Sequence, residues 1–452
     1  MPRAAESPAF DAASRNRWRR GLLLGAPLAL AGLYRWQRPL LLTGTGYAAH
    51  NACAVRHVAG RSDAATDLPP NPLVRHLRVR EDGDTAEVGL LGLLSRQRAW
   101  YTPGFGATVA RSRPELPRPV AVPAGANPFT SAPAPTAEPA VEEALGRAFG
   151  DDLDPAGRAA LGTRAVLVIR DGRLVAERYA PGFDAETPQL GWSVTKSVVN
   201  LVVGRLVERG VVSLDDAGLR PEWVGDARSG ITVRHLLSMT SGLSWDETYA
   251  LGTPITRMLY MEEDMGSYVA SRELAHEPGS FVQYSSGSTT LLCDVLAERS
   301  GLGANLPRTL LFAPLGLSSA VLETDGVGTP VGSSYMWATP RDWAAVGQFA
   351  LDDGVWGGER LLPEGWIAES VTAVHGSGEQ DGNAAGWWAN LRADGTLVHP
   401  ELPEDAYFAK GHDAQWIAVV PSARLVVVRL GFTPAREDDR VPRLVADLLP
   451  SR

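Results

Sequence analysis

A Ser-x-x-Lys pair at the start of an apolar segment is the feature that most constrains this chain. Of the 43 lysines and arginines in the chain, only Lys196 and Lys410 are lysines. Lys196 stands three positions after Ser193. Arginine keeps its proton in proteins, whereas a buried lysine can become a neutral amine and act as a base. The pair therefore indicates nucleophilic catalysis, although so short a motif also arises by chance.

The residues that follow predict a largely buried helix over residues 193–208. Apolar side chains recur close to the helical period, at Val198, Leu201, Val202 and Leu206. Ser193 then lies at the helix N-terminus and Lys196 one turn further on the same face, so that hydroxyl and amine can meet. Burial at that position lowers the pKa of a lysine. The alternative is a helix-capping serine followed by a surface lysine.

Composition excludes several classes of function. The 452 residues, 44% of them hydrophobic, are enough for one large core or two ordinary ones. The net charge is −9 and no basic stripe stands out beyond the N-terminus, which argues against nucleic-acid binding. Two cysteines allow at most one disulfide and no cysteine-based metal site. The chain has no Gly-x-Ser-x-Gly or His-Glu-x-x-His motif, and we expect neither cofactor nor metal.

The N-terminus differs from the rest of the chain. Seven arginines in residues 1–38 flank an apolar run at 21–34. That run is short for a membrane-spanning helix and suits a signal-peptide core with a cleavage site at 29–31. Extension through Trp36 to Leu42 could instead make a retained anchor, and a soluble amphipathic helix is the third alternative. We expect a membrane anchor or signal segment, with the body on the extracytoplasmic side.

Three further segments follow. Residues 39–111 form an N-terminal extension with strand-like stretches such as 86–94, and the Gly-x-Gly beginning at Gly44 is interpreted as a turn rather than a nucleotide loop. Residues 112–140 hold eight prolines and predict an extended linker or surface strap. The main domain covers 141–452.

The main domain has strand patterns at both of its ends. Residues 166–170 and 173–179 predict a β-hairpin with its turn at Asp171-Gly172. Helices with loops follow to about residue 320. The C-terminal part predicts strands at 397–399, 415–420 and 424–430 and a helix at 440–449. This pattern indicates one antiparallel sheet assembled from distant segments, with a separate helical lobe between them and a site between the lobes.

Two more segments carry candidate catalytic groups. Tyr284 could share a proton with the lysine and relay it to a leaving group, although a buried tyrosine that anchors a turn is the alternative. Gly411 lets the backbone approach a substrate closely, and the N–H of His412 can complete an oxyanion hole with the N–H of Ser193. His412 and Asp413 are expected on opposite faces of a strand, so we expect no serine–histidine–aspartate relay.

Several segments in order resemble the serine β-lactamase and penicillin-binding-protein-like hydrolases, particularly esterases and 6-aminohexanoate-dimer hydrolase-like amidases related to class C. They are WSVTK at 192–196, ITVRHLLSMTSGL at 231–243, YSS at 284–286, ATPRDW at 338–343, LPEGW at 362–366 and GHDAQ at 411–415. The resemblance implies an α+β, two-lobed fold with an antiparallel sheet flanked by helices plus an all-helical lobe. It also implies Ser193 as acylated nucleophile, Lys196 as its base and Tyr284 as proton relay.

Two departures affect the substrate. Ser286 stands where penicillin-processing relatives carry asparagine, and Ala409 stands in place of the lysine of their Lys-Thr-Gly element. The resemblance places Tyr249 in a substrate-covering loop, and with Ser286, Gly411 and Trp387 it completes our predicted substrate-binding set.

The sequence thus predicts an enzyme that cleaves a small ester or amide. A cell-wall D-Ala peptidase or β-lactam-binding protein and a non-catalytic scaffold remain the alternatives, and the natural substrate and oligomeric state stay open.

Overall fold

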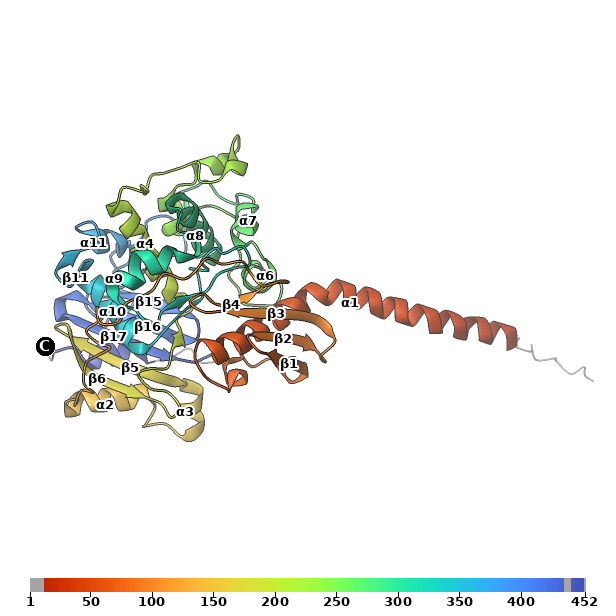
Figure 1. Ribbon diagram of the computed structural model, residues 1–452, viewed down its shortest axis with the longest axis horizontal. Coiled ribbons are helices and arrows are strands. Elements are labelled where there is room, and N and C mark those ends of the chain that lie inside the picture. The colour runs from red at the N-terminus through yellow and green to blue at the C-terminus, as the bar shows by residue number, and fades with distance from the viewer. Residues whose placement is uncertain (1–11, 435–439, 451–452) are drawn as a thin grey trace, which may run out of the picture.

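A six-stranded antiparallel sheet joins segments that lie far apart in the chain (Figure 1). The computed structural model describes residues 12–434 and 440–450, and for residues 12–28 only the course of the backbone. The strand order is β14-β15-β16-β17-β5-β6. The strands are β14 (Trp388–Ala389), β15 (Tyr407–Gly411), β16 (Gln415–Val420), β17 (Leu425–Gly431), β5 (Thr163–Arg170) and β6 (Arg173–Tyr179). The predicted sheet assembled from both ends of the domain is confirmed.

The predicted hairpin is also confirmed, and its turn explains its register. Asp171 and Gly172 both have positive φ, 49° and 73°, which is the backbone of the tight turns that join two twisted strands. Arg170 pairs with Arg173 across this turn. The strand expected at 397–399 is wrong, because that segment is a loop held by Asn390, whose side chain contacts the backbone of His399. Its place beside β16 is taken by β15.

Alternate residues of the sheet serve two cores. Val426 and Val428 of β17 belong to the large core that includes α10 (Pro340–Leu351), while Leu425 and Val427 face α2 (Pro139–Ala148) and α12 (Val441–Asp447). All seven residues of β17 are buried, as expected for a strand covered on both faces.

A helical lobe lies between the two groups of strands in sequence (Figure 1). Its helices are α4 (Val194–Glu208), α5 (Val233–Leu237), α6 (Pro254–Met261), α7 (Met265–Ala270), α8 (Ser286–Ser300) and α9 (Ala313–Leu315), and α11 (Trp366–Ser370) lies beyond α10 in the chain. The short strands here and between the lobes are β7 (Gln189–Leu190), β8 (Phe281–Val282), β9 (Val321–Leu322), β10 (Met336–Ala338), β11 (Val355–Trp356), β12 (Glu359–Arg360) and β13 (Ser377–Gly378).

The N-terminal extension is a helix laid on a small meander. Helix α1 (Ala12–His57) packs its alanine-rich end on the four-stranded sheet β1 (Leu77–Asp82), β2 (Thr85–Leu90), β3 (Leu94–Thr102) and β4 (Gly106–Val109). The turn expected at Gly44 is therefore wrong, because those residues lie inside α1. Gly46 serves close packing instead, since a Cβ there would collide with the carbonyl of Tyr260.

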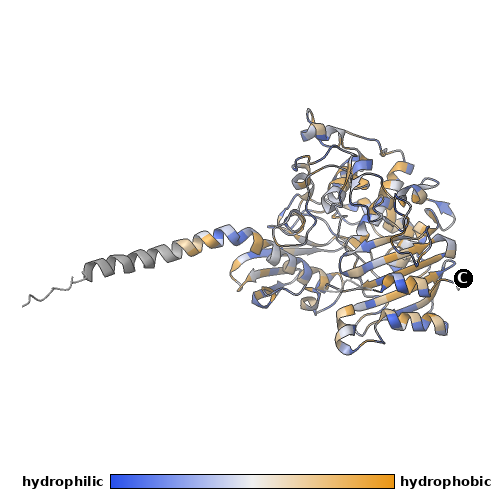
Figure 2. Cartoon of the chain, turned by 180° about the vertical axis from the view of Figure 1, so that it is seen from behind, coloured by the Kyte–Doolittle hydropathy of each residue, from blue (hydrophilic) through white to orange (hydrophobic). Residues whose placement is uncertain are grey.

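The outer part of α1 projects from the body (Figure 1). The part of this helix that Figure 2 colours by hydropathy begins with an apolar stretch. Across the described ranges, none of the helices is both long and apolar enough to cross a bilayer. Residues 1–11 of the expected anchor or signal segment lie outside the described residues.

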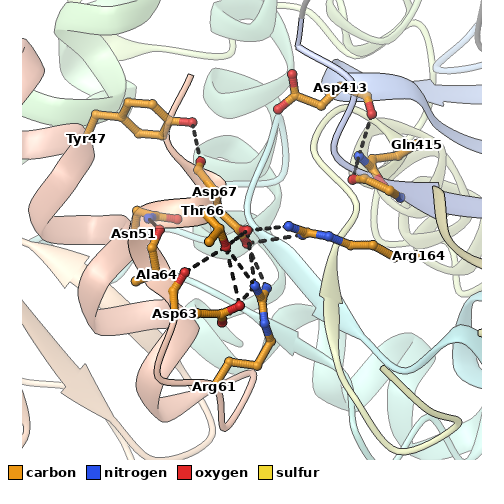
Figure 3. A network of polar contacts seen from close by, with 11 residues as sticks. Tyr47, Asn51, Arg61, Asp63, Ala64, Thr66, Asp67, Arg164, Asp413 and Gln415 are labelled. Carbon is orange, nitrogen blue, oxygen red and sulfur yellow. Dashed lines mark hydrogen bonds and ion pairs between the residues drawn. The ribbon is translucent and has the colours of Figure 1, made fainter. Parts of the chain in front are cut away.

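Two sets of polar contacts fix the N-terminal segments to the main domain. The carboxylate of Asp67 binds Arg61 of the extension and Arg164 of β5 at once (Figure 3). Residues 111–138 contain no regular helix or strand and run over the surface, where the buried Asn127 donates to Asp342 at 2.7 Å. The extension is thereby held against the face of the domain that carries Ser193.

Candidate active site

Ser193 and Lys196 meet at the N-terminus of α4, as the sequence predicts. Ser193 is the N-cap residue of the helix and is partly exposed, whereas the side chain of Lys196 lies one turn further and is buried. The Lys196 Nζ lies 2.8 Å from the Ser193 Oγ. Trp192, directly before the serine, has φ of +48°, a conformation that a non-glycine residue adopts at an energetic cost. Because the side chain of Lys196 is buried, the alternative of a surface lysine is excluded.

Burial of Lys196 makes its neutral form more accessible than it is in water. Its Nζ also donates to the Ser286 Oγ at 2.9 Å and to the carbonyl oxygen of Ser333 at 2.8 Å, so all three protons of an ammonium have acceptors. Burial nevertheless lowers the pKa of Lys196 to about 8, and the negative charge of Glu247 opposes that shift. A lysine with this pKa supplies a useful fraction of neutral amine near neutral pH.

Glu247 is a site residue that the sequence reasoning missed. Its Oε1 accepts a hydrogen bond from the Ser286 hydroxyl at 2.5 Å, and its Oε2 accepts from the Ser286 N–H at 2.9 Å and from Trp245 Nε1 at 2.6 Å. The carboxylate is thus fixed one side chain away from the lysine. The hydroxyl of Ser286 belongs to this chain of hydrogen bonds, and its predicted contact with a substrate stays a prediction. The resemblance to the family places the loop at 245–249 over the substrate, but the sequence prediction names only Tyr249 of this loop.

Tyr284 lies at the start of α8, on the other side of the lysine. Its ring centroid is 4.8 Å from the Lys196 Nζ. Burial and the charge of Glu247 raise the pKa of Tyr284, while the hydroxyl of Ser193 lowers it. The phenol is therefore protonated at neutral pH and close to both members of the pair, which is what a proton donor to a leaving group requires.

The two neighbouring tryptophans have different environments. Trp387, predicted to contact substrate, is only 1% exposed and lies in the main core against Tyr407. Trp388 instead stacks on Tyr284 with ring centroids 5.5 Å apart. Successive residues of an extended segment point to opposite faces. Trp387 therefore packs in the core, and the tryptophan that contacts a site residue is the next one, Trp388.

Gly411 closes the site opposite the serine. A Cβ at this position would collide with the Gly191 carbonyl and lie 3.2 Å from the Ser193 nitrogen, so only glycine fits. The next residue, His412, begins a 3₁₀ turn. The backbone of residues 411–412 thus runs beside the Ser193 N–H, where an oxyanion hole would form.

The expectation for His412 and Asp413 rested on the wrong local structure. The two residues lie in the 3₁₀ turn, and Asp413 has φ of +57°, so strand alternation does not apply. His412 Nε2 comes within 3.5 Å of Asp413 Oδ1, a contact that is not a hydrogen bond. The imidazole stacks on Tyr249 instead, with centroids 4.6 Å apart.

Tyr249 lies beside the site within a cluster of rings. Its ring meets the edge of Trp192 at 6.2 Å, and burial raises its pKa. Its hydroxyl has no hydrogen-bond partner among the described residues, although Ser334 lowers its pKa. A contact between this tyrosine and a substrate remains a prediction.

Metal-binding side chains do not gather near this site. Over residues 12–434 and 440–450, no three histidine, cysteine or acidic residues are grouped so that they could hold a metal ion. Both cysteines are buried and free.

Comparisons with known proteins agree with this architecture. Residues 147–449 match the family model described as Beta-lactamase. The 6-aminohexanoate-dimer hydrolase of Paenarthrobacter ureafaciens is 30% identical over 227 residues, which cover 47% of this chain and 57% of that protein. The chain therefore spans little more than half the length of this relative.

Two solved structures show the same fold. The putative 6-aminohexanoate-dimer hydrolase from Bacillus anthracis has a TM-score of 0.57 at 21% identity, covering 71% of this chain and 87% of that one. EstCE1, described as a hydrolase with promiscuous acyltransferase activity, has a TM-score of 0.55 at 20% identity, covering 68% and 98%.

Proposed function

Because the chain belongs to the β-lactamase family of serine hydrolases, we propose that it cleaves a small ester or amide through an acyl-enzyme on Ser193. One observation carries the proposal: the Nζ of a buried lysine lies 2.8 Å from a partly exposed serine hydroxyl. A neutral amine at that distance can take the proton of the hydroxyl as its oxygen attacks a carbonyl carbon.

Acylation then uses the groups around the pair. The Ser193 proton passes to Lys196, the Oγ–carbon bond forms, and the carbonyl oxygen becomes an oxyanion. The N–H groups of Ser193 and His412 are the proposed donors to that oxyanion, with Gly411 providing the close approach. Collapse breaks the bond to the leaving alcohol or amine, which takes a proton from Tyr284, and Tyr284 is reprotonated from Lys196. In the second half of the reaction, water takes the place of the alcohol or amine and attacks the carbonyl carbon of the acyl-enzyme, giving its proton to Tyr284 as Tyr284 passes its own to Lys196. The bond to the Ser193 Oγ then breaks, the Oγ takes a proton from Lys196, and the acid is released.

The environment of Lys410 supports an ester or amide over a cell-wall peptide. Its Nζ lies 5.4 Å from the ring centroid of Trp388, which stacks on Tyr284, and 4.5 Å and 5.2 Å from those of Trp416 and Phe408. The last two rings belong to the second core, which also contains α2 and α12, whereas Ala409 belongs to the core shared with α4. The ammonium of Lys410 thus lies among aromatic rings, while Ala409 at the position of the family's lysine has no ammonium, so a carboxylate-bearing β-lactam or D-Ala peptide loses that contact.

A fluorophosphonate probe tests the proposal. We expect the folded protein to be labelled once, with the adduct on the peptide that contains Ser193, and Ser193→Ala to remain unlabelled. A fluorescent penicillin forms the second arm, and stable acylation of Ser193 by it would favour the peptidase alternative. Folded wild-type protein that takes up neither probe would contradict the proposal.

We also propose that the N-terminal helix attaches the protein to a membrane surface, with the body on the extracytoplasmic side. Leu30, Leu33 and Trp36 of α1 are 67%, 53% and 74% exposed, and arginines flank them, as in interfacial helices. Fractionation of the full chain beside a Leu33→Asp/Trp36→Asp variant tests attachment: the variant should move to the soluble fraction. Protease accessibility on intact cells tests the side.

A further inference from the structure

A cavity of about 490 Å³ lies between the N-terminal extension and the main domain. This volume is within the range of small-molecule sites, about 300–1,000 Å³. Leu41 and Tyr47 of α1 and Leu73 form one side, and Leu251 and Tyr260 form the other. The extension thus supplies one wall of the cavity, although the family model begins only at residue 147.

The lining of the cavity is mainly apolar. Among the described residues that line it there is no aspartate, glutamate, lysine or arginine. Three threonines contribute methyl groups, because their hydroxyls donate to backbone carbonyls: Thr43 to Leu40, Thr45 to Ser95 and Thr256 to Ala250, at 2.6–2.7 Å. A charged group entering here would lose its hydration without gaining an ion pair, whereas an apolar chain would not.

The cavity lies next to the candidate active site and shares three ring-bearing residues with its surroundings. Trp192, Tyr249 and His412 all line it. Trp192 directly precedes Ser193, and His412 directly follows Gly411, whose backbone lies against the Ser193 nitrogen. The three rings contact one another and form the end of the cavity nearest the serine.

We infer that this cavity receives an uncharged alkyl chain of the substrate, and that the N-terminal extension is present to build it. The inference rests on the proposed function and narrows it to esters or amides that carry an aliphatic chain. The chain could belong to the acyl group or to the leaving alcohol, which share this chemistry. Each methylene that leaves water for such a site strengthens transition-state binding about fourfold.

Two substrate series measure this effect on the full chain. The acyl arm uses p-nitrophenyl acetate, butyrate, hexanoate and octanoate, and the alcohol arm uses ethyl, butyl, hexyl and octyl acetates. We expect kcat/KM to rise in one arm by up to about fourfold per methylene until the cavity is full. A 7-aminoheptanoyl ester, equal in length but charged, should lose most of the gain of the octanoyl ester.

A pair of glycines on α1 provides a matched test. Gly44 lines the cavity, and a Cβ there would have only ordinary contact with Leu251 Cδ2, at 3.7 Å, so Gly44→Leu fills the space without backbone strain. Gly32 has nothing within 4 Å, so Gly32→Leu makes the same change in solvent. In the arm that shows the gain, the ratio of kcat/KM for the longest chain to that for the shortest should fall at least tenfold in Gly44→Leu and stay within twofold of wild type in Gly32→Leu. Leu251→Ala, which enlarges the cavity, should shift the optimum to longer chains.

The outcomes separate this inference from the proposed function. Hydrolysis of acetate esters with Ser193 labelling, but with kcat/KM flat in both arms, overturns the inference and leaves the function standing. A chain-length gain that is equal in Gly44→Leu and wild type also overturns it, because the gain then arises elsewhere. Absence of hydrolysis in both arms together with an unlabelled Ser193 overturns both.

Discussion

Removing the negative charge of Glu247 should lower the pKa of Lys196 and move the activity to lower pH. The carboxylate is linked to the lysine through the hydroxyl of Ser286 and favours the ammonium form. Since the proposed base is the neutral amine, kcat/KM of the wild type should rise with pH through about 8, where the lysine loses its proton. Glu247→Gln keeps the shape of the side chain and removes its charge.

The size of the shift follows from the geometry. Hydrogen bonds of 2.9 Å and 2.5 Å in series join the Lys196 Nζ to the Glu247 Oε1 through Ser286. The charges are then at most about 5.4 Å apart, and at an effective dielectric constant of about 20 they attract by roughly 3 kcal/mol. One pKa unit corresponds to about 1.36 kcal/mol, so the pKa of Lys196 should fall by about 2 units.

The scarcity of lysine makes the shift directly measurable. Lysine labelled with ¹³C at Cε gives two side-chain signals, from Lys196 and Lys410, and Lys410→Arg assigns them. Titration of the Lys196 signal gives its pKa in wild type and in Glu247→Gln, and the pH profile of ester kcat/KM should follow it. The limiting rate at high pH should not rise, because a less basic amine is a weaker general base.

A second carboxylate near the site is the control. Glu379 accepts a hydrogen bond from the Tyr284 N–H at 3.2 Å but is exposed and has no part in the pKa shift of Lys196. Glu379→Gln should therefore leave both the titration and the pH profile in place. An unchanged or raised pKa of Lys196 in Glu247→Gln would refute the electrostatic reasoning, and a pH profile that does not follow the titration would refute the role of Lys196 as base.

Three further changes test the site and the docking of the extension. Lys196→Arg should nearly abolish turnover, because arginine keeps its proton, and wild-type-like hydrolysis would remove Lys196 from the mechanism. Tyr284→Phe should lower kcat about 10²–10⁴-fold while Ser193 still accepts a fluorophosphonate, and an unchanged kcat would exclude the relay. Asp67→Asn, at a partly buried carboxylate between two arginines, should lower the free energy of unfolding in urea by about 1–3 kcal/mol, whereas the exposed Asp63→Asn should change it by less than about 0.5 kcal/mol.

The parts of the structure that the sequence predicted depend on local spacing. Lys196 lies three positions after Ser193, and a helix brings such a pair onto one face in any fold that buries it. The hairpin at Asp171-Gly172 likewise needs only a two-residue turn that accepts positive φ. Tyr284 is predicted from its motif rather than from spacing, since nothing in the 87 residues between it and Lys196 indicates that they meet.

The parts that were missed depend on contacts between distant segments. Glu247 reaches the lysine through a serine 39 positions away, and a carboxylate in a polar loop looks like any other until that serine is in place. The cavity wall is more distant still, because residues of α1 face Leu251 across about 200 positions of sequence. The sequence predicts a turn at Gly44 instead of the continuation of α1, since glycines fit either structure until the meander and Tyr260 define a surface for the helix. The sequence could therefore indicate the candidate catalytic groups, while the cavity that we propose for the substrate arises only when the extension is docked on the domain.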